Sequence, residues 1–124
     1  MGFVSSSREL EVYKLARQMS LEIYTLTLSF PKEERYSLTD QIRRSSRSIG
    51  AQIAESWAKK RYEKHFVSKL TDADGEQQET QHWIETAFDC GYISEEQQQF
   101  FLSKYAEIGK MIQSMINKAG LFCK

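Results

Sequence analysis

Residues 62–90 read YEKHFVSKLTDADGEQQETQHWIETAFDC, the longest uninterrupted helical pattern in the chain. Its apolar and small side chains recur at alternating intervals of four and three residues, which is the period of one helix face. Gly91 follows and suits the left-handed backbone with which many helices end. The pattern therefore predicts a helix over residues 62–90, with one face formed by Phe66, Leu70, Ala73, Gln77, Thr80, Ile84 and Ala87.

Three further segments carry the same period. The first covers residues 8–29, opens on a capping-box pattern at residues 6–9 and is ended by Pro31, the single proline. The others cover residues 38–58 and 95–119. No segment alternates with a period of two, so we expect no strand.

Four helical segments with short connections predict an all-α fold, an antiparallel up-down four-helix bundle. A length of 124 residues is typical of one domain, so residues 1–124 are expected to form a single bundle. Two questions stay open at this stage. Nothing in residues 58–64 forbids a continuous helix, and the polar residues Gln77 and Thr80 are expected either to fix helix register or to face a subunit interface.

Formal charge is balanced over the chain but segregated along it. Seventeen Lys and Arg stand against seventeen Asp and Glu. Residues 32–69 hold ten basic and five acidic side chains, whereas residues 70–103 hold eight acidic ones and no Lys or Arg. The two blocks must therefore face each other, a partner or a neighbouring copy.

Arginines and small residues share the side of helix 38–58 that lies opposite its apolar stripe. Arg43, Arg44 and Arg47 can bind carboxylates or phosphates through two parallel hydrogen bonds, and form a candidate nucleic-acid or partner surface. Ala51 and Ala54 continue this side and permit close approach of another backbone. The alternative is an ordinary solvated charged face.

One flank of helix 62–90 carries acids followed by an aromatic residue. Asp72, Glu76, Glu79 and Trp83 are interpreted, together with Ala51 and Ala54, as a candidate subunit interface, since aromatic residues are enriched at buried contacts. Trp83 alone is better explained as a residue that widens the bundle core.

No catalytic motif is present, so we expect neither an enzyme nor a cofactor. Glu79 and His82 have the Glu-x-x-His spacing of di-metal carboxylate bundles, but His65 offers no second copy, so we expect no metal site. Cys90 and Cys123 form no disulfide framework and are expected to be reduced thiols. With neither a signal peptide nor a membrane-length apolar run, the chain is expected to be cytoplasmic and not membrane-bound.

Several motifs resemble those of a known family. Residues 41–49 (QIRRSSRSI) and 52–55 (QIAE), with 12–16, 30–36 and 91–93, are similar to the bacterial four-helix-bundle proteins named for reading frames inside 23S rRNA intervening sequences. The resemblance covers about residues 9–116. The chain departs from it at Gly50 and Ser56, where many members carry proline and glycine.

The resemblance implies a non-enzymatic protein that assembles into a homopentamer. A related accessory protein of diversity-generating retroelements is thought to bind nucleic acid and a reverse transcriptase through a basic surface. We therefore expect a homo-oligomeric helical scaffold that binds a macromolecular partner. The alternative is an accessory protein that uses Arg43, Arg44 and Arg47 to bind RNA or a nucleic-acid-bound protein, although overall neutrality disfavours strong polyanion binding. A di-metal carboxylate bundle is a remote third hypothesis.

Overall fold

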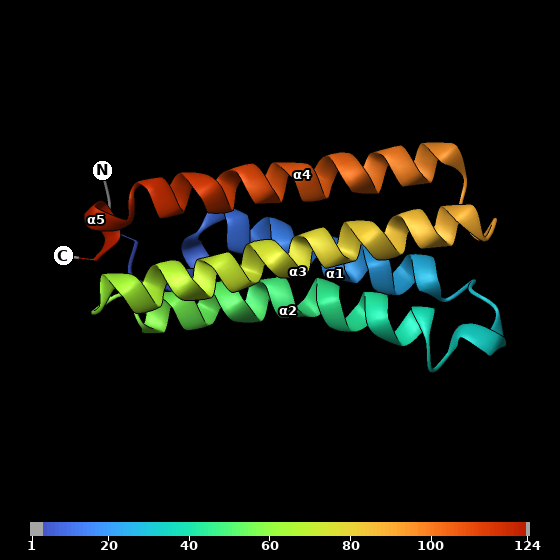
Figure 1. The fold of residues 1–124 in the computed structure, drawn as a ribbon, viewed down its shortest axis with the longest axis horizontal. Coiled ribbons are helices and arrows are strands. Elements are labelled where there is room, and N and C mark those ends of the chain that lie inside the picture. The colour runs from blue at the N-terminus through green and yellow to red at the C-terminus, as the bar shows by residue number, and fades with distance from the viewer. Residues whose placement is uncertain (1–3, 124) are drawn as a thin grey trace.

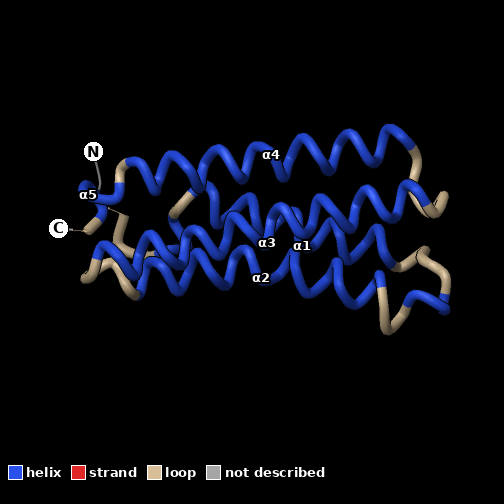
Figure 2. Tube along the Cα trace, viewed as in Figure 1, coloured by secondary structure: helices blue, strands red, loops and turns tan. Residues whose placement is uncertain are grey.

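Four long α-helices make up the computed structural model, which describes residues 4–123 (Figures 1 and 2). No strand occurs among these residues, as the sequence predicted. Two 3₁₀ turns and a short helix near the C-terminus are the other helical elements of the described residues. The elements are η1 (Ser7–Glu9), α1 (Glu11–Thr27), η2 (Lys32–Glu34), α2 (Leu38–Ala58), α3 (Glu63–Asp89), α4 (Glu95–Asn117) and α5 (Ala119–Phe122).

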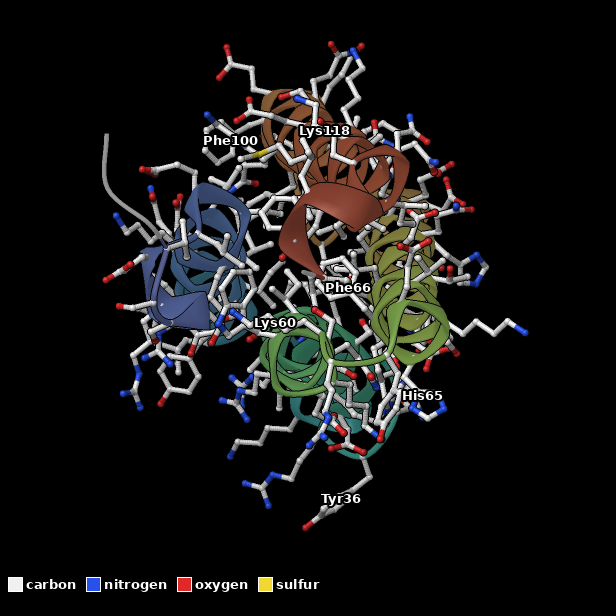
Figure 3. All side chains as sticks on the ribbon, turned by 90° about the vertical axis from the view of Figure 1, so that its left-hand side faces the viewer. Tyr36, Lys60, His65, Phe66, Phe100 and Lys118 are labelled. Atoms are coloured by element: carbon white, nitrogen blue, oxygen red, sulfur yellow. The ribbon has the colours of Figure 1, made fainter. Side chains whose placement is uncertain are left out.

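The connections alternate between the two ends of the bundle. Those from α1 to α2 and from α3 to α4 lie at one end, and the turn from α2 to α3 lies at the other, beside α5 (Figure 1). Viewed along its length, the molecule places one helix at each corner of a square (Figure 3). Accordingly α1 and α3 each pack against both α2 and α4.

The core is built from the stripes that the sequence predicted. All seven positions on the predicted face of α3 are buried, and Phe66 points into the centre of the bundle (Figure 3). Gln77 and Thr80 are among them, so both face the interior of one chain. The Thr80 hydroxyl lies 2.8 Å from Ser45 Oγ of α2 and 2.9 Å from the Glu76 carbonyl, which satisfies it across the α2–α3 contact.

The first and last helices are shorter than predicted. Residues 8–29 were expected as one helix, but Ser7–Glu9 form a 3₁₀ turn capped by the Ser6 side chain. Leu10 then adopts an extended backbone (φ −71°, ψ 132°), and α1 begins only at Glu11. At the other end, Lys118 leaves the helical region and separates α4 from α5, where one helix over 95–119 was expected.

The helices α2 and α3 are separate, which answers the question that the sequence left open. Lys59 ends α2 with φ −102° and ψ 9°, and its N–H bonds back to the Glu55 and Ser56 carbonyls. Tyr62 has an extended backbone (φ −122°, ψ 111°), which no helix interior tolerates. The observed α3, Glu63–Asp89, is one residue shorter than predicted at each end.

Gly91 ends α3 in the left-handed conformation that the sequence predicted, with φ 78°. The Tyr92 N–H bonds to the Ala87 carbonyl and the Gly91 N–H to the Phe88 carbonyl, each at 2.9 Å, a Schellman motif. The Tyr92 hydroxyl then donates to Glu34 at 2.8 Å. The two connections at this end of the bundle are thereby joined.

Within residues 4–123, every helix is too short or too polar to span a membrane.

Candidate interaction surface

A groove of about 740 Å³ follows the seam between α1 and α2, at the end where those helices are connected. All three arginines that the sequence singled out line it, with two further cations from the connection. Asp40 is the one acid among the lining residues. We call this the basic groove, defined by Lys32, Arg35, Arg43, Arg44 and Arg47.

Arg43 is held against α1. Its Nε donates to Thr27 Oγ1 at 2.8 Å, and its guanidinium lies 4.8 Å from the centroid of the Tyr24 ring. Both contacts leave the charge unneutralised, because a hydroxyl and an aromatic face carry no formal charge. Arg43 therefore contributes a fixed positive charge to the wall of the groove.

Arg44 turns the other way, toward α3. It pairs with the Glu79 carboxylate and lies 3.6 Å from Glu76 Oε1. Glu79 also accepts a 3.0 Å bond from Trp83 Nε1, and Ser48 donates to Glu76 at 3.1 Å. Two acids of the predicted interface flank are thus bound inside the same chain.

This network alters the acidity of its members. Partial burial raises the pKa of Glu79, but the bonds from Trp83 and Arg44 outweigh burial, and the pKa ends below its ordinary value. The hydrogen bond to Glu79 raises the pKa of Arg44 further. Arg44 therefore stays charged and paired. Its main contact links α2 to α3, and its charge is neutralised there and not offered to a ligand in the groove.

The remaining basic side chains of the groove are unneutralised. Within residues 4–123, Lys32, Arg35 and Arg47 make no ion pair. All three are exposed at the groove. With Arg43 they present four cations against Asp40.

The other residues of the predicted subunit interface are divided between α3 and the side of α2 that faces α1. Asp72 is exposed on α3, with its carboxylate 4.0 Å from Lys69 Nζ. Trp83 is half-buried against the core, as the core-widening interpretation predicted. Ala51 and Ala54 lie instead on the α1–α2 side, where they line a second hollow of about 420 Å³ that also touches Arg47.

An apolar stripe along α1, which continues onto the cap residue Leu28, was not predicted from the sequence. Leu21 and Leu28 are each 63% exposed, and Tyr24, between them, is 42% exposed. We call these three residues the α1 outer stripe. These residues are three and then four positions apart, and this spacing could have revealed the stripe. The buried stripe of the same helix has the same period, and only that stripe was predicted. Leu21 lines the second hollow and Leu28 the basic groove.

The side chains that could coordinate a metal ion do not cluster in the described residues. Among residues 4–123, no group of three His, Cys, Asp or Glu could hold a metal ion. His82 is exposed, with its ring edge-on to Trp83 at 4.7 Å between centroids. Cys90 is exposed and Cys123 half-buried, both as free thiols.

Comparisons with known proteins agree with this architecture. Residues 8–114 match the family model of the 23S rRNA-intervening sequence protein. A crystal structure of a protein of unknown function from the S23 ribosomal protein family of Bacteroides thetaiotaomicron is similar, with a TM-score of 0.76 and 29% sequence identity. The alignment covers 86% of this chain and 95% of that one. No curated protein matches the chain. The match over most of its length shows that this chain belongs to the 23S rRNA-intervening sequence protein family.

Proposed function

We propose that this chain is a non-enzymatic scaffold, in which antiparallel up-down bundles assemble into a homo-oligomer that binds a macromolecular partner. The family resemblance suggests five copies. The proposal places the assembly in the cytoplasm, where the free thiols of Cys90 and Cys123 stay reduced.

The α1 outer stripe is the observation that carries the assembly proposal. Leu21 and Leu28 keep most of their surface in water, although burying such a side chain contributes roughly 1.5–3 kcal/mol. They flank hollows lined by Ala51 and Ala54, which permit close approach of a neighbouring helix. A contiguous apolar stripe beside a concave surface is typical of a protein–protein contact.

Light scattering after size-exclusion chromatography tests this proposal at micromolar concentration. We expect wild type to give a multiple of 14.5 kDa and the variant Leu21→Ser/Leu28→Ser to give a smaller mass. Leu121→Ser is the matched control, because Leu121 is 67% exposed but lies on α5, outside the stripe. A wild type that runs as a single chain would contradict assembly, and an unchanged mass for the double variant would contradict this face.

Nucleic-acid binding is a second candidate, supported by the cations of the basic groove. Arginine binds phosphate with directed hydrogen bonds, and one concave surface is lined by four cations that form no ion pair with any described residue. Such binding would weaken steeply with salt, because each phosphate contact releases counterions.

RNA retention measured at several salt concentrations tests the second candidate. Arg35→Ala/Arg47→Ala should weaken retention and reduce the slope of affinity against salt by about two, one per lost phosphate contact. The matched control is Lys59→Ala/Arg61→Ala, which removes the same charge from the α2–α3 turn at the opposite end. Equal retention by both double variants would argue against the groove as the RNA site.

A further inference from the structure

The end of the α3–α4 hairpin carries the charge opposite to that of the basic groove. Four exposed acids surround this connection, and no Lys or Arg occurs anywhere in residues 70–103. Two aromatic residues beside the acids are also partly in water: Phe88 is 36% exposed and Phe100 is 42% exposed. Phe100 lies beside α4 on the side toward α1 (Figure 3). We call this surface the acidic tip, defined by Glu85, Asp89, Glu95 and Glu96 with Phe88 and Phe100.

The acidic tip and the basic groove lie at the same height along the bundle. Both are next to connections at one end of the molecule (Figure 1). The bond from the Tyr92 hydroxyl to Glu34, and the Phe30 and Tyr92 rings 5.5 Å apart, join these two connections directly. The groove opens along α1 and α2, whereas the tip belongs to α3 and α4. One chain therefore presents both surfaces at one level, on different helix pairs.

We infer that the basic groove of one copy receives the acidic tip of the next copy in the assembly. This inference rests on the proposed homo-oligomer and names its contact. The contact is head-to-tail, because two different surfaces meet, and every copy offers one of each. If the copies are related by rotation about an axis parallel to their helices, corresponding points of all copies lie at the same height along that axis. The basic groove of one copy can then meet the acidic tip of the next.

Charge and apolar surface favour this occupant over nucleic acid. The tip adds four carboxylates where Lys32, Arg35, Arg43 and Arg47 make no ion pair within residues 4–123. An exposed aromatic side chain of the tip, Phe88 or Phe100, can cover Leu28, which a phosphate backbone leaves in water. A polyanion in the groove would leave the acidic tip without a partner, whereas a second copy satisfies both surfaces.

Charge reversal tests the pairing. The groove variant is Arg35→Glu/Arg47→Glu, and the tip variant is Glu85→Lys/Asp89→Lys, whose new cations suit the C-terminal end of α3. Each should lower the assembly mass measured by light scattering, with unchanged helical circular dichroism. The chain that combines all four substitutions should regain the wild-type mass, because its charges are exchanged but again complementary. The turn variant Lys59→Glu/Arg61→Glu is the matched control and should keep the wild-type mass.

The remaining outcomes separate this inference from the proposed function. A wild type that runs as a single chain overturns both. A wild type that assembles, with groove and tip variants that keep its mass, overturns the pairing and leaves the scaffold standing. Dissociation of the two variants without recovery in the combined chain also overturns the pairing. Loss of wild-type assembly after nuclease treatment would overturn the pairing, because nucleic acid and not the acidic tip would then hold the copies together.

Discussion

Arg44 differs from its neighbours in the basic groove because, in the described part of the chain, it alone of the arginines there has acidic partners. Removing it would leave Glu79 and the partly buried Glu76 without their cation. We expect Arg44→Ala to lower the free energy of unfolding by about 1–2 kcal/mol, a small value because the arginine is half exposed. Urea denaturation measures this, with Lys59→Ala of the exposed α2–α3 turn as a control expected within about 0.5 kcal/mol of wild type. Equal effects would mean that the network adds nothing.

Glu79 gives the same network a pH dependence. Its pKa is lower in the folded chain than in the unfolded chain. Its stabilisation is therefore present above the ordinary carboxyl pKa of about 4.3, and is lost as pH falls through the lower folded value. We expect Glu79→Gln to be less stable than wild type at neutral pH, with the difference shrinking as acid is added. A difference that stays constant across the acid range would contradict the lowered pKa.

The positions of the arginines were predictable from sequence, but their partners were not. A helical wheel places Arg43, Arg44 and Arg47 on one side of α2, and all three line the basic groove. Their separate roles depend on Thr27 of α1 and Glu79 of α3, which the local pattern does not position. Side-chain direction at a helix surface is decided by the neighbouring helices.

The end of α3 depends on a single glycine. Gly91 has φ 78°, a conformation that costs an L-residue roughly 1–2 kcal/mol. Gly75 lies inside the same helix, and a Cβ added there would meet nothing within 4 Å. We therefore expect thermal unfolding to show Gly91→Ala destabilised and Gly75→Ala stabilised, the latter by about 0.5–1 kcal/mol. The same sign for both substitutions would contradict the assigned cap.

Close approach of α3 and α4 depends on the absence of a side chain at Gly109. A Cβ there would lie 2.8 Å from Gln77 Nε2, which is buried and bonded to Asp74. We expect Gly109→Ala to destabilise the fold by about 1–3 kcal/mol, the usual range for overpacking. In a double-mutant cycle, Gln77→Ala should remove most of this penalty because it removes the clashing amide. Additive effects would place the cost of Gly109→Ala elsewhere.

The helices were readable from sequence wherever the apolar period was clear. The range Leu38–Ala58 matches the predicted segment, although only the change of apolar stripe beyond it indicated where it ends. The start of α1 was not readable, because Ser6 caps a 3₁₀ turn as well as it would cap an α-helix. The break near Tyr62 contains neither proline nor glycine, so its signal is tertiary.

At the scale of the whole molecule, segregated charge is divided between two kinds of contact. Part of it is neutralised within one chain, where Arg44 meets Glu76 and Glu79. Among residues 4–123, several other charges of the two blocks make no ion pair, including those of Lys32, Arg35 and Arg47 in the basic groove and those of the acidic tip. These two surfaces are opposite in sign and lie at one level, which supports the proposed contact between copies.

Native mass spectrometry of the full chain, sprayed from a volatile buffer at micromolar concentration, tests the scaffold proposal most directly. We expect one dominant closed species at a whole multiple of 14.5 kDa, five-fold by the family resemblance, with no added RNA mass. A dominant species at 14.5 kDa would contradict the scaffold proposal.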